Sequence, residues 1–397
     1  MLQGKTVVLG VTGSIAAYKI ANLTSMLTKL HADVHVLMTE NATNFINPIT
    51  FETLTNHKCL VDTFDRNFNY NIEHVALGER ADVVLVAPAS ANIIAKMAHG
   101  IADDMLSTTI LACRCKKIVA PAMNTNMYEN PIVQANIQTL RDFGVEVIEP
   151  DTGLLACKAV GKGKMPAEDI LLEYILREVQ YEHDLSGKHV LVTAGATRES
   201  LDPVRYITNH STGKMGYALA SVAARRGADV TLVSAATGLA VSPGVHIIPV
   251  ESAQDMYEAV CAHAEKQDII IKAAAVADYT PAEFSEQKIK KGEGDASLAL
   301  VRTKDILAWL GENKREDQFV CGFSMETENL VENSRAKLLK KKADMIVANH
   351  LREEGAGFGT DTNVVTLITK EDTEKLPVLS KEKVACCIFD RILEKMG

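Results

Sequence analysis

The 397-residue sequence has no apolar run that approaches the roughly 18 residues of a transmembrane helix. Its first residues, MLQGKTVVLGVTGS, lead straight into a strand-like run, without a basic segment and a cleavage site, so we expect no signal peptide. The composition, with 47% hydrophobic and 23% charged residues, is that of a globular protein. We therefore expect a cytoplasmic protein that does not associate with membranes.

Paired metal-ligand spacing and an excess of positive charge are also missing. None of the eight cysteines lies in a CxxC pair, and no pair of histidines complements them, which argues against a disulfide framework and a structural zinc site. The formal net charge of −9 argues against general nucleic-acid binding. Anionic ligands therefore require local features, such as helix N-termini or the basic cluster at 288–291.

What the sequence does contain is a pattern that occurs twice. The segments GKTVVLGVTGS, from Gly4, and GKHVLVTAGAT, from Gly187, both run from Gly-Lys through a β-branched stretch into a Gly-containing turn. Short apolar runs follow in each half and alternate with helical segments, as in strands buried on both faces of a parallel sheet. The pattern predicts an α/β fold of two doubly wound (Rossmann/flavodoxin-like) parallel-sheet domains in tandem, 1–184 and 185–397, joined at 181–188.

The second half carries an insertion between its first strand and its first helix. Helices are expected over 15–30 and 216–226, and the extra segment, TRESLDPVRYITNHSTGKMG, covers 197–216. Ligands in open α/β sheets bind at the carboxyl ends of the strands, and long loops there are usually functional. The insertion therefore predicts a binding site in the second half.

The turn after the first strand of the N-terminal half suits a phosphate. Gly13 and Ser14 begin the first helix, where free amides and the helix dipole attract anions, although ordinary helix capping is the alternative. A GxGxxG fingerprint is absent, and the second strand ends in Thr39 where a nicotinamide-binding domain would carry an acid. FMN therefore fits better than a dinucleotide.

Two further loops of this half carry small polar residues. Ser90 follows the third strand, and the segment GIADDMLST contributes Ser107. The segment PAMNTNMY then follows a strand that ends at Pro121. Asn124 is well placed there to hydrogen-bond a carboxylate or an amide, whereas a turn with methionine packing is the alternative.

The segment PAMNTNMY, with the upstream IEHVALGERADVVLVAPASAN, resembles the flavin-dependent cysteine decarboxylases. The resemblance implies that His74 is the catalytic histidine, Cys157 the flap cysteine that donates the final proton, and Asn124, with Met127, the binding site of the substrate carboxylate. FMN would oxidise the thiol side of the substrate to a thioaldehyde, so that carbon dioxide can leave, and would then return the hydride. The implied FMN contacts are Gly13, Ser14, Thr39, Ser90 and Ser107.

The predicted flap, LLACKAVGKGKMP, departs from the family pattern at two positions. Lys158 stands where the family has Gly, and Lys164 where it often has Arg. A cation beside a thiol lowers its pKa. A larger fraction of Cys157 would then be deprotonated at rest and unable to donate a proton. We predict that Lys158 points outward and that Cys157 still donates the proton.

The insertion of the second half resembles the phosphopantothenate–cysteine ligases, and AAAVADY, QKIKK, GFSMETEN and AKLLKKKADMIVAN follow it in the family's order. The resemblance implies CTP and an acyl-cytidylate intermediate. Lys288 would be the catalytic lysine and Asn209 would turn the acyl-cytidylate over to cysteine. Asp278 would hold Mg²⁺ or the nucleotide, and Arg205 the carboxylate or phosphate of phosphopantothenate. The other implied CTP contacts are Ala273, Ala274, Lys304, Asp305, Ile306, Leu307, Phe323, Lys337 and Lys341.

Other interpretations of these segments remain open from the residues alone. The run AKLLKKKAD is also typical of a solvated helix face, and an Asp at a strand end is often only a cap. The segment STGKMG is not a P-loop, because Met215 follows Lys214 where a P-loop requires Ser or Thr.

The order of the two halves resembles the bacterial bifunctional enzymes of coenzyme A biosynthesis. These ligate cysteine to 4′-phosphopantothenate and then decarboxylate the product to 4′-phosphopantetheine. The family implies trimeric decarboxylase and dimeric ligase contacts, and so a larger homo-oligomer such as a dodecamer. Two rivals are a nicotinamide oxidoreductase, disfavoured by the missing GxGxxG, and a non-catalytic flavoprotein, disfavoured by the presence of His74 and Cys157.

Overall fold

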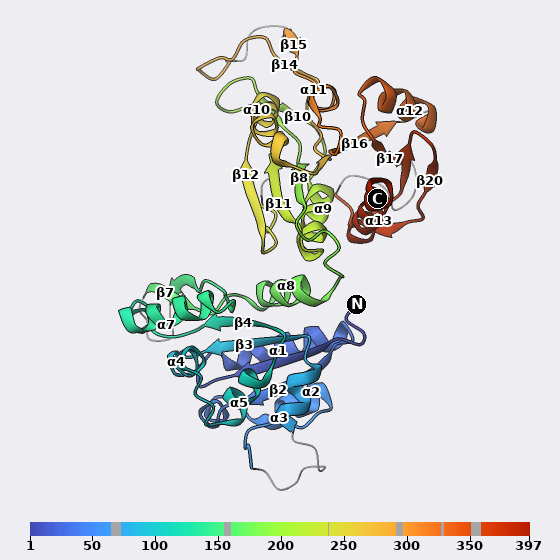
Figure 1. Cartoon of the computed structure of the whole chain (residues 1–397). Coiled ribbons are helices and arrows are strands. Elements are labelled where there is room, and N and C mark those ends of the chain that lie inside the picture. Colours follow the sequence, from blue (N-terminus) through green and yellow to red (C-terminus); the bar gives the residue numbers. More distant parts are fainter. Residues whose placement is uncertain (65–72, 155–159, 237, 291–296, 327–328, 351–358) are drawn as a thin grey trace. The chain divides into compact units, whose positions relative to one another are not determined.

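The computed structural model describes residues 1–64, 73–154, 160–236, 238–290, 297–326, 329–350 and 359–397. The chain forms two compact units, Met1–Glu182 and His183–Gly397. Figure 1 shows the strands of each unit gathered into a sheet with helices around it. Each unit is described by itself.

The N-terminal unit is built on a five-stranded parallel sheet in the order β2-β1-β3-β4-β5. This is the flavodoxin-like order, in which the chain changes direction between β1 and β3 and leaves a crevice at their carboxyl ends. The strands are β1 (Thr6–Val11), β2 (Asp33–Met38), β3 (Val83–Ala89), β4 (Lys116–Pro121) and β5 (Glu146–Val147).

Helices cover both faces of this sheet, because alternate residues of its buried strands point to opposite sides. Val7 and Leu9 of β1 pack in one apolar cluster with α1, α2 and α8, and Val8 packs in the other cluster with α3, α4, α5 and α7. The helical segments are α1 (Ala17–Lys29), η1 (Glu40–Asn44), α2 (Pro48–Thr55), α3 (Glu73–Arg80), α4 (Ala91–His99), α5 (Met105–Ala112), α6 (Thr125–Tyr128), α7 (Pro131–Asp142) and α8 (Glu168–Val179).

A two-stranded hairpin forms the predicted flap. Strands β6 (Asp151–Leu154) and β7 (Val160–Lys164) pair antiparallel, and Cys157 and Lys158, between them, lie outside the described residues. The hairpin is attached to the loop after β4, since the Met123 amide donates to the Gly163 carbonyl at 3.1 Å. Gly163 has φ +141°, and a side chain there would collide with the Met123 carbonyl. The flap residues therefore connect to the loop that contains PAMNTNMY.

The C-terminal unit is built on an eight-stranded sheet in the order β12-β11-β8-β13-β16-β17-β19-β20. The first six strands are parallel, and β19 and β20 add an antiparallel edge. The chain changes direction between β8 and β13. The strands are β8 (His189–Ala194), β11 (Asp229–Ser234), β12 (Val245–Pro249), β13 (Ile269–Lys272), β16 (Phe319–Glu326), β17 (Met345–His350), β19 (Val365–Thr369) and β20 (Thr373–Lys375).

Two helical layers enclose this second sheet. Ile269 and Ile271 of β13 pack with α9 and α13, whereas Ile270 packs with α10, α11 and α12. The helical segments are α9 (Lys214–Arg225), α10 (Ala253–His263), η2 (Ala264–Lys266), α11 (Ile306–Asn313), α12 (Leu330–Lys340) and α13 (Lys381–Met396). Small antiparallel pairs are formed by β9 (Arg198–Ser200) with β10 (Tyr206–Thr208), β14 (Tyr279–Pro281) with β15 (Leu300–Arg302), and β18 (Thr362–Asn363) with β21 (Leu379–Ser380).

The predicted fold class is confirmed, with differences in detail. The first helix begins at Ala17, so Gly13 and Ser14 lie in the loop before it rather than at its start. The insertion is not a plain loop, because it contains the β9–β10 hairpin, and α9 begins at Lys214, two residues earlier than expected. Among the described helices, none combines the length and apolar character required to cross a bilayer.

Candidate active sites

The carboxyl ends of β1 and β3 are joined by one buried threonine. The Thr12 hydroxyl donates to the Pro88 carbonyl at 2.6 Å and accepts from the Ser90 amide at 3.0 Å. Ser90 also caps α4, where its hydroxyl accepts from the Ile93 amide at 3.4 Å. The sequence analysis did not single out Thr12, which fixes the spacing of the two loops that flank the crevice.

The loop before α1 leaves the N-terminus of that helix open. No side chain caps α1, and its first turn contains no acidic residue. The Ser14 hydroxyl accepts only from the Ala16 amide, at 3.3 Å. A side chain at Gly13 would come within 2.9 Å of the Cβ of Asn41, so the loop must carry glycine to pass η1. An uncapped helix N-terminus at a sheet crevice suits a phosphate group.

Thr39 lies at the carboxyl end of β2, beside this crevice. Its amide donates to the Val11 carbonyl at 3.0 Å, whereas its buried hydroxyl oxygen has no hydrogen-bond partner among the described residues. A buried hydroxyl without a partner is unfavourable, and a bound polar group relieves the cost. Thr39, Ser14 and the α1 N-terminus therefore fit a flavin that carries a phosphate.

The loop after β4 presents the predicted substrate residues. The Asn124 side chain accepts from the Asn126 amide at 2.9 Å and caps the short helix α6. Met127 in that helix is 49% exposed. The hydroxyl oxygen of Thr125 is buried and has no partner among the described residues, a second such group that the sequence analysis missed.

The remaining predicted residues of this unit occupy different surroundings. His74 lies half-buried in α3. The Ser107 hydroxyl is engaged inside α5, where it donates to Asp104 at 2.8 Å in a capping box. Ser107 lines a largely apolar hollow together with Phe143 and Leu140. Thr12, Ser14 and Thr39 are not among the residues that line this hollow. Its contact with FMN stays a prediction.

One group of metal-ligand type lies at the amino end of β2. The Asp33 carboxylate is 3.1 Å from His35 Nε2 and 2.7 Å from His57 Nε2, and the two imidazole rings stack. Arg80 donates to His35 Nε2 at 2.8 Å, so a cationic side chain already contacts the position where an ion would coordinate. This group lies at the amino ends of the strands, whereas the predicted flavin residues lie at their carboxyl ends.

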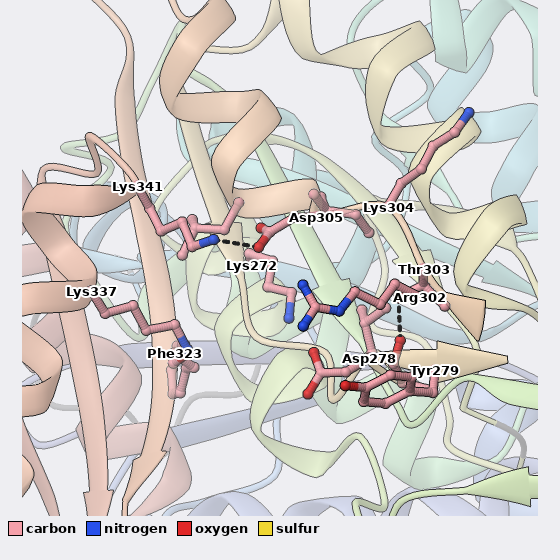
Figure 2. Close-up of a pocket in the computed structure, with 14 residues that line it drawn as sticks. Lys272, Asp278, Tyr279, Arg302, Thr303, Lys304, Asp305, Phe323, Lys337 and Lys341 are labelled. Atoms are coloured by element: carbon pink, nitrogen blue, oxygen red, sulfur yellow. Dashed lines mark hydrogen bonds and ion pairs between the residues drawn. The ribbon is translucent and has the colours of Figure 1, made fainter. Parts of the chain in front are cut away.

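The C-terminal unit contains a cavity of about 430 Å³ at the carboxyl end of β13. Figure 2 shows cationic and acidic side chains around one space, contributed by β13, the segment between β13 and β14, β15, the segment before α11, and α12 with the residue that follows it. Eight predicted CTP residues line it, namely Asp278, Lys304, Asp305, Ile306, Leu307, Phe323, Lys337 and Lys341. It is also lined by Lys272, Val276, Ala277, Tyr279, Arg302 and Thr303, which the sequence analysis did not assign.

Two lysines of this cavity have acceptors within the protein. Lys341 donates to the Asp305 carboxylate at 2.5 Å, and Lys337 donates to the Phe323 carbonyl at 3.1 Å. Asp305 also caps α11, since it accepts from the Ala308 amide at 2.9 Å. Burial alone raises the pKa of Asp305, but the hydrogen bonds from Lys341 and Ala308 hold it below its usual value.

Lys272 also lines this cavity. Its side chain is half-buried, and desolvation and the positive charge of Lys337 lower its pKa to about 8, against the attraction of Asp305 and Asp278. Asp278 is exposed at the rim, and its side chain has no hydrogen bond among the described residues. The cavity therefore combines several cations with one available carboxylate, as a nucleotide polyphosphate with a metal ion requires.

Several predicted residues lie outside this cavity. Ala273 and Ala274 follow β13, and the Ala274 amide donates to the Thr193 hydroxyl at 3.1 Å. The Asn209 side chain is exposed and donates to the Ala275 carbonyl at 3.3 Å. Lys288 is exposed in the segment between β14 and β15 and is not brought to the cavity.

The Arg205 guanidinium forms an ion pair with the buried carboxylate of Asp202. The guanidinium donates to Asp202 at 2.6 Å and to the Ile289 carbonyl at 2.6 Å. Asp202 also accepts from the amides of Val204, Arg205 and Ile289. This carboxylate holds the insertion against the segment that carries Lys288, an organising role that the sequence analysis missed.

Comparisons with known proteins cover both units. Residues 1–180 match the family model described as Flavoprotein, and residues 185–396 match that of the DNA/pantothenate metabolism flavoprotein C-terminal domain. The coenzyme A biosynthesis bifunctional protein CoaBC of Bacillus subtilis (strain 168) is 46% identical over 396 residues, 99% of this chain and 97% of that protein. The chain belongs to this family of bifunctional coenzyme A biosynthesis proteins. The CoaBC protein of Escherichia coli (strain K12) is 39% identical over 397 residues, 99% of this chain and 98% of that protein.

Solved structures resemble each half separately. The C-terminal domain of a CoaBC protein is 45% identical, covers 52% of this chain and 95% of that chain, and has a TM-score of 0.45. The FMN-dependent cysteine decarboxylase SpaF is 34% identical, covers 41% of this chain and 92% of that chain, and has a TM-score of 0.37. The family resemblance seen in the sequence is confirmed by the full-length relatives. The chain is a bifunctional flavoenzyme of coenzyme A biosynthesis, a ligase and a decarboxylase that acts on small molecules.

Proposed function

We propose that the two activities divide between the two halves of the chain. Residues 1–184 form the FMN-dependent phosphopantothenoylcysteine decarboxylase, and residues 185–397 the CTP-dependent phosphopantothenate–cysteine ligase. The cavity of about 430 Å³ carries the ligase assignment. Five cationic side chains line it, in a chain whose formal net charge is −9: Lys272, Arg302, Lys304, Lys337 and Lys341.

Ligation requires activation of the substrate carboxylate. A carboxylate oxygen of phosphopantothenate attacks the α-phosphorus of CTP, the bond to pyrophosphate breaks, and an acyl-cytidylate forms. Lys337 and Lys341 lie at the cavity wall, where their charges stabilise the negative charge that builds on the polyphosphate. The amine of cysteine then attacks the acyl carbon, CMP leaves, and the amide product forms.

We assign the magnesium ion that accompanies CTP to Asp278. Magnesium in nucleotide sites usually takes one or two carboxylates together with phosphate oxygens. Asp305 is engaged with Lys341 and the α11 cap, whereas the Asp278 side chain is exposed at the cavity rim and has no hydrogen-bond partner among the described residues. Asp278 is therefore the better placed of the two carboxylates.

The insertion and the β14–β15 segment serve the second substrate. We assign turnover of the acyl-cytidylate to Asn209 and Lys288, and binding of phosphopantothenate to the Arg205 segment. The contacts of Asp202 with Arg205 and Ile289 support this grouping, because they keep the two segments together. Lys288 would approach the nucleotide by movement of its segment or from a second copy of the chain.

The N-terminal unit would hold FMN at the crevice between β1 and β3. Its phosphate would lie against Gly13, Ser14 and the α1 N-terminus, and the Thr39 hydroxyl would gain a partner. A bound flavin supplies reversible hydride acceptance. We assign the substrate carboxylate to Asn124 and His74 and the final proton transfer to Cys157, whose hairpin is joined to the loop containing Asn124.

The same proposal extends to assembly and location. The β14–β15 segment exposes large apolar side chains, among them Phe284, Leu298 and Val301, as does the start of α1 with Ile15 and Tyr18. Exposed apolar groups of this kind mark protein interfaces. We propose dimeric contacts between ligase units, trimeric contacts between decarboxylase units, and a cytoplasmic location.

Purified protein mixed with phosphopantothenate, cysteine and Mg²⁺-CTP tests the assignment. CMP and pyrophosphate should appear together with carbon dioxide, and the protein should be yellow with the absorbance of an oxidised flavin. Asp278→Asn should reduce CMP release while leaving decarboxylation of added phosphopantothenoylcysteine unchanged. Loss of both activities in this variant would contradict the division between the halves.

A further inference from the structure

Strand β13 ends in a lysine at an apolar position. Its first three residues are isoleucines with no exposed surface, and Lys272 is the next residue. Side chains alternate across a strand, so Lys272 lies on the same face as Ile270, the face covered by α11 and α12. Lys272 pairs with Thr193 of β8 on one side and Gly322 of β16 on the other. Its ammonium group is therefore positioned at the point where the sheet order reverses.

The other lysines of the cavity have partners, whereas the described residues offer Lys272 no hydrogen bond or ion pair. Lys341 is held by Asp305, Lys337 by the Phe323 carbonyl, and Lys304 lies over the Tyr257 ring at 4.6 Å. Within the part of the chain that the structure describes, the Lys272 ammonium makes no hydrogen bond and no ion pair. An ammonium group has three donors, and withdrawing them from water without acceptors is unfavourable.

The charged groups around Lys272 carry a surplus of positive charge, which favours the binding of an anion. The groups that face it are Asp278, Arg302, Asp305, Lys337 and Lys341, from the loops after β13 and before α11 and from β15 and α12. Figure 2 shows the Lys272 amine directed into the space between Asp278 and Asp305. Cations outnumber carboxylates there, and Asp305 is already engaged by Lys341.

We propose that Lys272 binds the polyphosphate of the nucleotide and takes up a proton from solvent when the nucleotide binds. The proposal rests on the assignment of CTP to this cavity. It adds a residue that the family motifs do not mark, and it makes nucleotide binding dependent on pH.

The direction of the pH dependence follows from the free protein. With a pKa of about 8, Lys272 is largely charged at pH 6.5 and largely neutral at pH 9.5. A polyphosphate beside it favours the charged form and raises its pKa. Binding at pH 8 should therefore take up about half a proton, and nucleotide affinity should fall as the pH rises through 8.

Calorimetric titration of the holoenzyme with Mg²⁺-CTP, without phosphopantothenate so that no turnover occurs, measures both effects. Titrations at pH 8 in buffers of different ionisation enthalpy give the number of protons taken up. We expect Lys272→Met to weaken CTP binding by about 10- to 100-fold, as loss of a charge-assisted hydrogen bond does. Lys272→Arg should bind within a few-fold of the wild type but without this uptake, because arginine stays charged.

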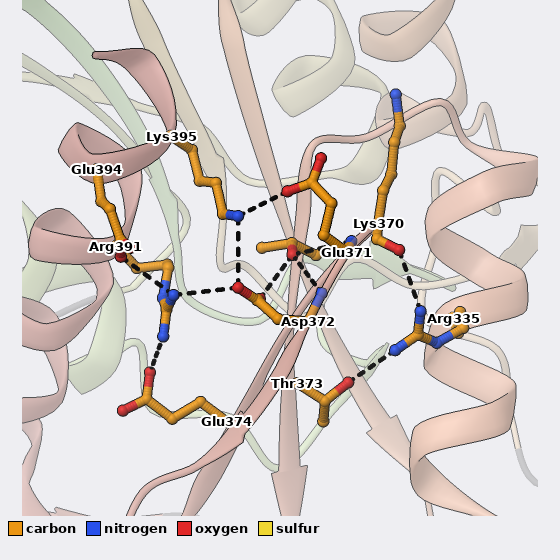
Figure 3. Close-up of polar contacts among 10 residues, drawn as sticks. Arg335, Lys370, Glu371, Asp372, Thr373, Glu374, Arg391, Glu394 and Lys395 are labelled. Carbon is orange, nitrogen blue, oxygen red and sulfur yellow. Dashed lines mark hydrogen bonds and ion pairs between the residues drawn. The ribbon is translucent and has the colours of Figure 1, made fainter.

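A matched control lies at the other end of the same sheet. Lys370 is exposed after β19, and only its backbone carbonyl takes part in the polar contacts of Figure 3, where it accepts from Arg335 at 3.2 Å. Its amine points away from that network in the same view. Lys370→Met should therefore bind CTP with wild-type affinity and wild-type proton uptake.

The outcomes separate this inference from the function on which it rests. If the wild-type protein does not bind CTP, the nucleotide assignment fails and this inference fails with it. If the wild type binds but Lys272→Met binds equally well, Lys272 does not contact the polyphosphate. If Lys272→Met does not fold, Lys272→Arg decides, because unchanged proton uptake in that variant contradicts the proposal.

Discussion

The side-chain oxygen of Thr12 lies 3.0 Å from the Ser90 amide, which donates a hydrogen bond to it. The same hydroxyl donates to the Pro88 carbonyl, so one buried side chain joins the ends of two neighbouring parallel strands. These ends flank the crevice assigned to the flavin. We therefore expect the contact to couple the stability of the unit to the geometry of the proposed flavin site.

Thr12→Val should destabilise the N-terminal unit and weaken flavin binding. The substitution keeps the shape of the side chain but leaves the Pro88 carbonyl and the Ser90 amide without their partner, which costs about 1–3 kcal/mol. Thermal unfolding of the flavin-free protein should shift down by about 3–10 °C. Thr24→Val is the control, because its hydroxyl bonds only to the Ile20 carbonyl within α1. An unchanged melting temperature for Thr12→Val would contradict the role of this contact.

Thr39→Val should affect flavin binding without loss of stability. The Thr39 hydroxyl has no partner in the described protein, so its removal should leave the unfolding of the flavin-free protein unchanged or slightly improved. Flavin affinity should fall by about 10-fold, the value of one hydrogen bond to a charged group. Fluorescence titration with FMN measures this. Equal affinity in variant and wild type would place the flavin elsewhere.

Much of this architecture could be predicted from the sequence because its signals are local. The Gly-Lys segments and the apolar runs that begin at Ala32, Ala81 and Ala228 indicate parallel strands. Ser90 follows the run from Ala81 and Asn124 follows the strand that ends at Pro121, so both must lie at the carboxyl ends of strands in the same sheet. The eight nucleotide residues that line one cavity were implied only by the family resemblance, not by the strand pattern.

What could not be predicted depends on contacts between distant residues. Lys272 follows three isoleucines in the sequence, where it is indistinguishable from the polar end of a strand. Its significance comes from the cavity that it lines together with residues of α11 and α12. Thr12 and Asp202 gain their roles from Pro88 and Ile289, about 76 and 87 residues away. Periodicity and motif spacing carry no information on such pairs.

Asp202→Asn should impair ligation and spare decarboxylation. Burial alone raises the pKa of Asp202, but the hydrogen bonds from Arg205 and from three backbone amides hold it far below its usual value. An amide side chain loses the ion pair with Arg205 and cannot accept from all of these donors. We expect at least a 10-fold fall in kcat/KM for phosphopantothenate in a CMP-release assay. The result contradicts the assigned role if kcat/KM stays at the wild-type value.

Lys272→Met should raise the stability of the ligand-free protein, and more so at neutral than at high pH. A lysine whose folded-state pKa is about 8, below its unfolded value, binds fewer protons folded than unfolded between those two values, so stability rises with pH across that window. Below pH 8 the full cost of the desolvated charge is present. Removing it should raise the melting temperature at pH 7 by about 2–4 °C, with a smaller gain at pH 10. Lys370→Met, the control, should leave the melting temperature unchanged at both pH values. If Lys272→Met instead lowers the melting temperature at pH 7, the charge of Lys272 is compensated within the protein.

We propose that one chain performs two consecutive reactions in separate halves. The most direct test is one assay that follows CMP, carbon dioxide and phosphopantetheine from phosphopantothenate, cysteine and CTP, with wild-type protein and Cys157→Ser. We expect all three products from the wild type. We expect that the variant releases CMP at the wild-type rate but fails to complete the conversion to phosphopantetheine. Full conversion by Cys157→Ser, or the absence of CMP from the wild type, would contradict this proposal.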